Sequence, residues 1–284
     1  MPAVTVPDAE WFDLASGGGG GGRGGGGGAP YRIFRTRPRG PAPAAGFPLV
    51  IMLDANAAFA TFAEVLRRGA GRPQATGIDE AVLVGIGYPD GEDERARRTV
   101  DYTAGPGAEM RAGGVPARPT GGRDAFLAFI EGVLKPRLAA DLPLDPRRQT
   151  LFGHSLGGWF TLDVALRDST AFSSYVAVSP SIWWDEPRLL DGLSMARGRA
   201  LRLALLVGEW EEAMAPWQQG GPLSAEMATR RAARGMVTRA RTFAARAARE
   251  LGPPAEIAFT LLAGEDHASV LPTAMARALR FSRG

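Results

Sequence analysis

Short apolar runs that alternate with helical patterns constrain the fold of this chain more than any other feature. Continuous runs occur as LVIML (49–53), AVLVGI (81–86) and LRLALLV (201–207). Runs without polar alternation are typical of strands buried on both faces of a parallel sheet. Further strand candidates lie at 149–152, 174–178 and 256–261. The repeated strand–helix order predicts an α/β fold, with a mostly parallel sheet, right-handed crossovers and helices on both faces.

Two segments between or after the strands have helical periodicity. Apolar residues at 126, 129, 130, 133, 134 and 138 follow the spacing of one buried helix face. The segment Arg230–Leu251 reads as one long amphipathic helix, because its seven arginines fall on one half of a helical wheel and its larger apolar residues on the other. We expect these arginines to point away from the core as a solvated face. A face that contacts an anion or a membrane is the alternative.

The N-terminal part contains a glycine tract between two short patterns of strand character. Residues 17–28 hold eleven glycines interrupted only by Arg23. Because glycine loses the most conformational entropy on ordering, the tract predicts a flexible loop. The patterns at Trp11–Leu14 and Tyr31–Arg35 predict an N-terminal antiparallel hairpin around it. Too few residues precede the tract to form a domain, so we expect a single domain over residues 1–284.

The composition excludes several kinds of site. The chain has 284 residues and no cysteine, which excludes disulfides, thiolate metal ligands and a cysteine nucleophile. Its two histidines, His154 and His267, are too few for a zinc site built on several imidazoles, so we expect no metal and no cofactor. A net charge of +3 is too small to indicate nucleic-acid binding. Neither a membrane span nor a secretory signal is visible, so we expect a cytoplasmic location.

The motif that carries chemistry is Gly153-His154-Ser155-Leu156-Gly157. It matches G-x-S-x-G and stands directly after an apolar strand and before a helix. A sharp strand-to-helix turn forces the serine into a strained conformation, which requires small residues two positions to either side. The turn would expose the Ser155 hydroxyl and aim the Leu156 amide at a developing oxyanion. The sequence therefore predicts a serine nucleophile.

A serine nucleophile needs a base and an acid, and in this arrangement they follow the serine in the order acid, then histidine. His154 adjoins the nucleophile and its side chain should point away from it, so His267 is the candidate base. The acid is expected in the loop GEWEE after the strand at 201–207. Its spacing favours Glu211, with Glu209 and Asp185 as alternatives, and its task is to hold the imidazole in one tautomer.

The second oxyanion donor is expected in the loop that follows the strand at 48–53. The backbone N–H of Asn56, or that of Ala55, is the candidate. Asp54 in the same loop has an alternative structural role, as a cap of the helix that follows.

The chain resembles a known family over roughly residues 47–281. The matching stretches are LDANAAF, VGIGYP, RRTVDYT, GGRDAFLAFI, LFGHSLGGWFTL, SPSIWW, VGEWEE and GEDHASVLP. They stand in the order found in the α/β-hydrolase family that contains the siderophore (enterochelin-type) esterases and related hydrolases. The resemblance implies an α/β-hydrolase fold, a triad of Ser155, Glu211 and His267, and a loop beside the site that carries Trp183 and Trp184. The long glycine tract and Ala55, where the family commonly has glycine, are departures.

These features together predict a serine ester hydrolase that acts through an acyl-enzyme. The resemblance implies siderophore-type lactones, including an iron–siderophore complex, or aryl-acyl serine esters as substrates. Tyr88, Trp183, Trp184 and Arg98 suit an anionic aromatic group, although the tryptophans could instead pack as core. An acyltransferase on the same scaffold and a non-catalytic binding protein of this fold remain as alternatives.

Overall fold

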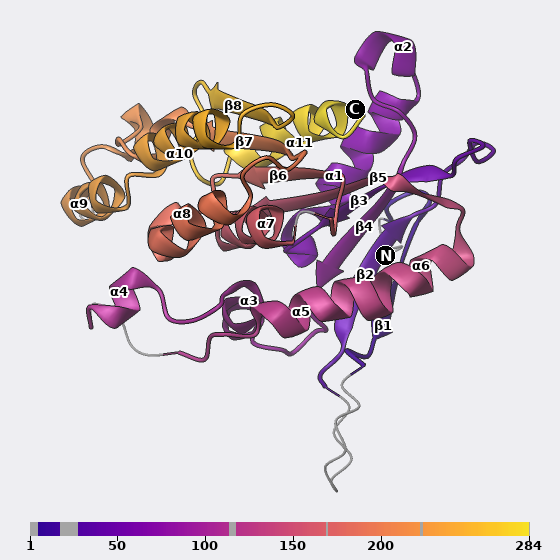
Figure 1. Cartoon of the computed structure of the whole chain (residues 1–284), viewed down its shortest axis with the longest axis horizontal. Coiled ribbons are helices and arrows are strands. Elements are labelled where there is room, and N and C mark those ends of the chain that lie inside the picture. Colours follow the sequence, from indigo (N-terminus) through magenta and orange to yellow (C-terminus); the bar gives the residue numbers. More distant parts are fainter. Residues whose placement is uncertain (1–4, 18–27, 114–117, 169, 222–223, 284) are drawn as a thin grey trace, which may run out of the picture.

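An eight-stranded sheet organises the chain (Figure 1). The computed structural model describes residues 5–17, 28–113, 118–168, 170–221 and 224–283. The strand order is β1-β2-β4-β3-β5-β6-β7-β8, so the sequence colours run across the sheet from the indigo β1 to the yellow β8. The strands are β1 (Ala9–Leu14), β2 (Tyr31–Thr36), β3 (Phe47–Met52), β4 (Val82–Gly87), β5 (Leu144–His154), β6 (Ser174–Val178), β7 (Arg202–Gly208) and β8 (Glu256–Leu262).

Strands β3 to β8 pair in parallel, whereas β2 is antiparallel to both β1 and β4. The predicted α/β fold with a mostly parallel sheet and an N-terminal antiparallel hairpin is therefore confirmed. Strand β5 begins at Leu144, earlier than its apolar run, because Leu144 pairs with Phe47 across a register shift. The predicted flexibility of the glycine tract falls mostly on residues 18–27, which lie outside the described residues.

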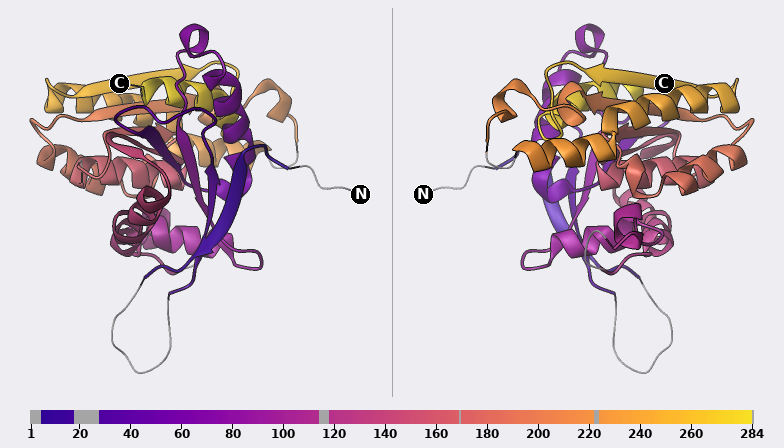
Figure 2. Two further views of the ribbon diagram at one scale, coloured as in Figure 1. Left: turned by 90° about the vertical axis from the view of Figure 1, so that its right-hand side faces the viewer. Right: turned by 90° about the vertical axis from the view of Figure 1, so that its left-hand side faces the viewer.

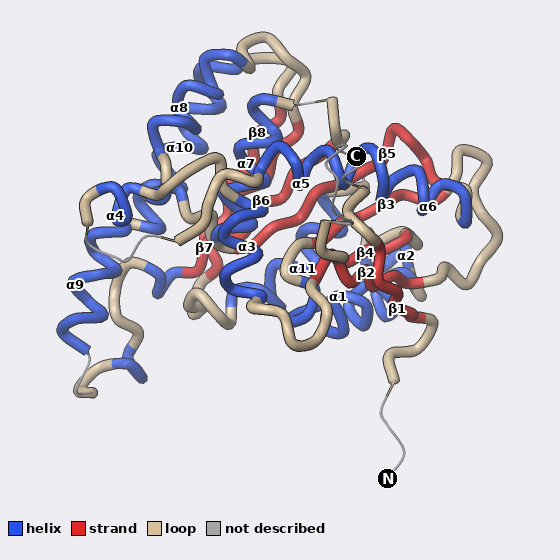
Figure 3. Tube along the Cα trace, turned by 90° about the horizontal axis from the view of Figure 1, so that it is seen from below, coloured by secondary structure: helices blue, strands red, loops and turns tan. Residues whose placement is uncertain are grey.

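Helices cover both faces of the sheet, as Figures 2 and 3 show from the side and from below. On one face α1 and α11 pack together over a core that includes Met52, Phe62 and Phe152. The other face is covered mainly by α5, α7, α8 and α10. The longer helices are α1 (Ala55–Ala70), α3 (Glu94–Tyr102), α5 (Arg123–Phe129), α6 (Lys135–Asp141), α7 (Leu156–Arg167), α8 (Glu186–Met195), α9 (Ser224–Arg234), α10 (Met236–Leu251) and α11 (Val270–Phe281). Short helical segments are α2 (Pro73–Thr76), α4 (Ala108–Arg111), η2 (Ile182–Trp184), η3 (Glu209–Glu211) and η4 (Pro216–Gln218).

The helical segment around residues 126–138 is confirmed in a modified form. Helix α5 runs through a π-helical segment, η1 (Ile130–Leu134), directly into α6. Phe126, Ile130 and Leu138 are buried on its inner face.

The expectation of one continuous helix over Arg230–Leu251 is wrong. Gly235 adopts the left-handed conformation, with φ 52° and ψ 46°, and separates α9 from α10. A helical wheel drawn across that break relates residues that do not share a helix axis. The arginines of α9 consequently do not continue the exposed face of α10, and Arg230, Arg231 and Arg234 line a cavity.

Candidate active site

Ser155 lies at the sharp turn between β5 and α7. Its backbone has φ 58° and ψ −118°, a strained conformation for a residue with a side chain. A Cβ on Gly153 would lie 2.2 Å from the carbonyl oxygen of Gly157, and one on Gly158 would lie 3.0 Å from that of Val178. The turn therefore requires glycine at position 153 and leaves little room for a side chain at position 158. It exposes the Ser155 hydroxyl at the carboxyl edge of the sheet.

Three predicted residues meet at this turn. The Ser155 hydroxyl lies 3.1 Å from Nε2 of His267, and Nδ1 of His267 lies 2.6 Å from Oε2 of Glu211. His267 comes from the loop between β8 and α11, and Glu211 from η3, directly after β7. With the Nδ1–H donated to Glu211, Nε2 is free to accept the serine proton. The arrangement can therefore deprotonate Ser155.

The two alternative acids have other partners in the described part of the chain. Glu209 accepts a hydrogen bond from the backbone N–H of Gly264 at 2.7 Å. Asp185 lies 3.4 Å from the Arg111 guanidinium. Of the three acids considered from the sequence, Glu211 is the one in contact with His267.

Glu211 is a buried carboxylate whose oxygens are all engaged. Its side chain is fully buried, whereas that of His267 is 43% exposed. Besides His267, it accepts hydrogen bonds from the backbone N–H of Gly208, at 2.7 Å, and from the Ser179 hydroxyl. Ser179 itself has a positive φ of 46°. Three donors compensate the cost of burying the charge. Ser179 was not singled out from the sequence; its only signal was its place in the run SPSIWW.

His154 contacts the candidate base, His267, rather than the nucleophile, Ser155. Its Nε2–H donates to the backbone carbonyl of His267 at 3.0 Å, and the two imidazole rings lie 4.7 Å apart. Burial lowers the pKa of His154 to about 3, so the ring is neutral near pH 7. His154 thereby supports the loop that carries His267.

The two candidate oxyanion amides begin neighbouring helices. Leu156 is the first residue of α7 and Asn56 lies in the first turn of α1, where backbone N–H groups lack intrahelical partners. The two helix starts are adjacent, because a Cβ on Gly157 would lie 3.3 Å from the Asp54 carboxylate. The alternative role of Asp54 as a side-chain cap of α1 is not found: its side chain makes no capping bond and instead accepts two hydrogen bonds from Arg98, both 2.8 Å.

The prediction that Tyr88 contacts the substrate is contradicted by its burial. Tyr88 is 1% exposed and its hydroxyl donates to Asp101 at 3.1 Å. The side chain of Asn56 holds the Tyr88 backbone through two hydrogen bonds of 2.8 Å. The sequence predicts Tyr88 near the site because this residue directly follows a strand. In the structure its ring packs in the core beside Tyr31.

Two cavities meet at the nucleophile, and both are lined by Ser155, Ser181, Trp183 and Arg234. The cavity of about 240 Å³ on the imidazole side has these further lining residues: Glu211, Met227, Arg230, Arg231, Met236 and His267. The cavity of about 330 Å³ on the other side has these: Arg95, Arg98, Thr99, Glu109, Met110, Arg118, Leu156 and Trp184. The predicted Trp183, Trp184 and Arg98 thus do line the site. Besides Arg98 and Arg234, four arginines line the two cavities and make their walls strongly cationic: Arg95, Arg118, Arg230 and Arg231.

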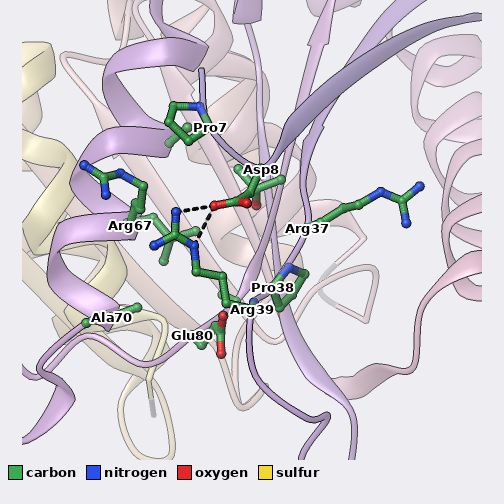
Figure 4. A pocket seen from close by; sticks show the side chains of 13 residues that line it. Pro7, Asp8, Arg37, Pro38, Arg39, Arg67, Ala70 and Glu80 are labelled. Carbon is green, nitrogen blue, oxygen red and sulfur yellow. Dashed lines mark hydrogen bonds and ion pairs between the residues drawn. The ribbon is translucent and has the colours of Figure 1, made fainter. Parts of the chain in front are cut away.

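Another cavity, of about 200 Å³, lies against α1 and β2 and contains none of the residues above (Figure 4). Arg39 donates to the Asp8 carboxylate at 2.6 Å, and Glu80 accepts from the backbone N–H of Gly40 at 3.2 Å. Its other two arginines, Arg37 and Arg67, pair with glutamates outside the cavity, and its described lining residues include no serine and no histidine. This cavity is thus separate from the candidate active site.

The described residues contain no group of three or more histidine, aspartate or glutamate side chains that could hold a metal ion. Among the helices of the same described ranges, none is both long and apolar enough to cross a membrane.

Comparison with known proteins gives one consistent family. The "Putative esterase" family model matches residues 28–247. The ferri-bacillibactin esterase BesA of Bacillus subtilis is 38% identical over 265 residues, covering 89% of this chain and 84% of the relative. The BES protein from Bacillus cereus superposes with a TM-score of 0.79 at 30% identity, over 99% of this chain and 98% of that one. The siderophore hydrolase EstB from Aspergillus nidulans has a TM-score of 0.80 at 26% identity, with 99% and 96% coverage. The expected α/β-hydrolase fold is confirmed.

Proposed function

This chain belongs to the esterase family of α/β-hydrolases and is a carboxylic ester hydrolase, and on that premise we propose that it cleaves siderophore-type esters through an acyl-enzyme formed on Ser155. The observation that carries the mechanism is the pair of hydrogen bonds, 3.1 and 2.6 Å long, that links Ser155 to His267 and His267 to Glu211. Each of the three groups has the geometry that its role requires.

In this proposal His267 takes the proton of Ser155 as the hydroxyl oxygen attacks the ester carbonyl carbon. The negative charge that develops on the carbonyl oxygen is stabilised by the backbone N–H of Leu156, with that of Asn56 as the second donor. His267 then protonates the leaving alcohol oxygen as its bond to the carbonyl carbon breaks, and the acyl group stays on Ser155 as a new ester. A water molecule, deprotonated by His267, attacks the acyl carbon, and His267 returns the proton to the Ser155 oxygen as the acid is released. Glu211 holds the ring of His267 in one orientation and stabilises the imidazolium.

The substrate class follows from the charge of the cavity walls together with the relatives. BesA is named a ferri-bacillibactin esterase, and EstB a siderophore hydrolase. Within the described part of the chain, Arg95, Arg118 and Arg230 line the two cavities without an ion-pair partner, whereas Arg98 and Arg234 are paired. Guanidinium groups beside Trp183 and Trp184 suit an acyl group that is both anionic and aromatic, by charge and by stacking. We therefore assign aryl-acyl serine esters, free or as an iron complex, as the substrate class.

Labelling with a fluorophosphonate probe tests the nucleophile. The wild type should gain the mass of one adduct, and Ser155→Ala should gain none at the same fold and stability. Labelling of another residue, or equal labelling of both proteins, would overturn the role of Ser155.

Steady-state kinetics test the substrate class. We expect a higher kcat/KM on a catecholate trilactone than on p-nitrophenyl esters of long-chain fatty acids. Trp183→Ala and Trp184→Ala should narrow this difference and affect p-nitrophenyl acetate less. A preference for long-chain esters would refute the siderophore assignment while leaving the serine esterase intact. A product whose formation requires an added alcohol would favour the acyltransferase.

A further inference from the structure

Two helices from distant parts of the chain meet over the nucleophile through one ion pair. Glu109 lies on α4 and Arg234 is the last residue of α9. Nε and Nη2 of Arg234 donate to the two carboxylate oxygens of Glu109, at 2.8 and 2.9 Å. Figures 1 and 3 show α4 and α9 at the same end of the molecule in two perpendicular views. The pair therefore connects two segments that project over the carboxyl edge of the sheet.

The position of the Arg234 guanidinium is defined by more than Glu109. It stacks on the ring of Trp183, with Cζ 4.0 Å from the ring centroid. The backbone carbonyl of Arg234 accepts a hydrogen bond from Arg239 at 3.0 Å, across the break at Gly235. A bidentate carboxylate and a stacked ring together hold the guanidinium in one place and plane.

Arg234 lies on the boundary between the two cavities. It lines both of them, together with Ser155, Ser181 and Trp183, whereas Glu109 lines only the larger one. The stacked side chains of Arg234 and Trp183 thus contribute to the lining of both cavities, as Ser155 and Ser181 do. A molecule that fills both cavities at once must therefore lie against Arg234 and Trp183.

The reaction assigns the cavities to the two halves of an ester. His267 must protonate the leaving oxygen, so the alcohol departs into the cavity that His267 and Glu211 line. The carbonyl oxygen must face the Leu156 amide, so the acyl group lies in the cavity that Leu156 and Trp184 line. We call these the alcohol-side and acyl-side cavities.

We propose that the Glu109–Arg234 ion pair determines which esters this enzyme accepts, by closing the passage between the acyl-side and alcohol-side cavities until a substrate with two bulky halves displaces it. The inference rests on the proposed function, because it assigns the cavities by the direction of acyl transfer. Small esters react in the closed state. Esters that are bulky on both sides require Arg234 to leave Glu109.

Opening the pair is inexpensive. The Arg234 and Glu109 side chains are 32% and 34% exposed, so water can solvate both groups once they separate. This partial exposure limits what the bidentate contact contributes, and removing it should raise the rate of opening by about two- to fivefold. The predicted effect is therefore modest and specific to large substrates.

The test compares two uncharged esters, which avoids direct attraction to the arginines. One is p-nitrophenyl acetate and the other is the cyclic trilactone of N-benzoylserine, which is bulky on both sides of each ester. The readout is the ratio of kcat/KM for the trilactone to kcat/KM for the acetate. Glu109→Gln should raise this ratio about two- to fivefold. The matched control is Glu64→Gln, which breaks the surface pair of Glu64 with Arg67 on α1 and should leave the ratio unchanged.

A second variant locks the passage. Because the chain has no cysteine, Glu109→Cys with Arg234→Cys can be joined specifically by a short bis-maleimide. The joined protein should lose turnover of the trilactone relative to the acetate. Each single-cysteine variant treated with the same reagent should not. An unchanged ratio in Glu109→Gln, or an equal loss on both esters after joining, would overturn the proposal.

The two proposals fail in different ways. If the wild type does not hydrolyse p-nitrophenyl acetate, or Ser155→Ala hydrolyses it equally well, the proposed function is wrong. If the wild type hydrolyses the acetate through Ser155 and the ratio does not respond to Glu109→Gln, only the role of the ion pair is wrong.

Discussion

Burial of His154 should make the stability of this protein depend on pH in a defined direction. In the folded state burial lowers the pKa of His154 to about 3, and the neighbouring His267 and Arg98 act in the same direction while Glu211 opposes them. In the unfolded chain the same imidazole titrates near its ordinary pKa of 6.5. Above pH 6.5 it is neutral in both states. As the pH falls from 6.5 towards 3, the unfolded state binds a proton that the folded state does not, so the free energy of unfolding decreases.

The size of this effect follows from the distance between the pH and the unfolded-state pKa. At pH 4.5 the imidazole of the unfolded chain is almost fully protonated and that of the folded chain is almost neutral. Each pH unit below the unfolded-state pKa then removes about 1.4 kcal/mol, so His154 should lower the free energy of unfolding by about 3 kcal/mol between pH 7.5 and pH 4.5. That is a large part of the stability of an ordinary domain.

Urea unfolding at these two pH values, followed by tryptophan fluorescence, measures the effect. His154→Gln keeps an N–H that can reach the His267 carbonyl but cannot be protonated. The constant cost of the substitution cancels when each protein is compared with itself at the two pH values. The wild type should lose about 3 kcal/mol more than His154→Gln. If the variant loses as much stability as the wild type, His154 is not held neutral in the folded state and the argument is refuted.

Three further substitutions, two of them with a control variant, test the site around the nucleophile. Glu211→Gln should lower kcat on p-nitrophenyl acetate by about 10⁴-fold, as loss of the carboxylate does in a serine protease triad. The control Glu209→Gln should have little effect on the same turnover, and the reverse order would move the acid to Glu209. Gly153→Ala should lower the free energy of unfolding by about 1–3 kcal/mol or more, because its Cβ would clash with a carbonyl oxygen 2.2 Å away. Thermal melts of both variants measure this. Gly132→Ala, with no atom within 4 Å of its Cβ, should leave the stability unchanged or raise it, and an equal loss of stability in the two variants would contradict the crowding argument. Ser179→Ala should lower kcat by about ten- to a hundredfold with KM unchanged, since hydrogen bonds to charged groups contribute about 1.5–3 kcal/mol, and a loss of stability at full kcat would show that Ser179 is merely structural.

The strands could be predicted from the sequence because their signal is local. A strand such as β4 or β7 is a continuous apolar run, and burial on both faces is enough to produce that pattern. The nucleophile turn was equally accessible, because glycine at 153 is required by an atom within a few residues of it. Features whose cause lies within one turn or one strand were thus predictable.

The missed features have causes that lie far away in the chain. Gly235 interrupts a convincing helical pattern, and an isolated glycine is compatible with either a helix interior or a helix end. That break turns Arg234 towards Glu109, a partner 125 residues away. Tyr88 follows β4 as expected, but its hydroxyl bonds to Asp101 in the core. Chain order locates a Cα atom near the site, whereas the direction of a side chain depends on its tertiary partners.

The backbone of two loops brings the acid Glu211 close to the base His267. The loops after β7 and β8 are joined directly, because the backbone N–H of Trp210 donates to the carbonyl of Glu265 at 2.9 Å. A Cβ on Gly208 would lie 2.6 Å from that same carbonyl, so the approach of the two loops requires glycine there. With the loops joined in this way, the backbones of Glu211 and His267 lie close enough for their side chains to form a hydrogen bond. The buried carboxylate of Glu211, which accepts three hydrogen bonds, then fixes the ring of the half-exposed His267. The base can therefore face the substrate without losing its orientation.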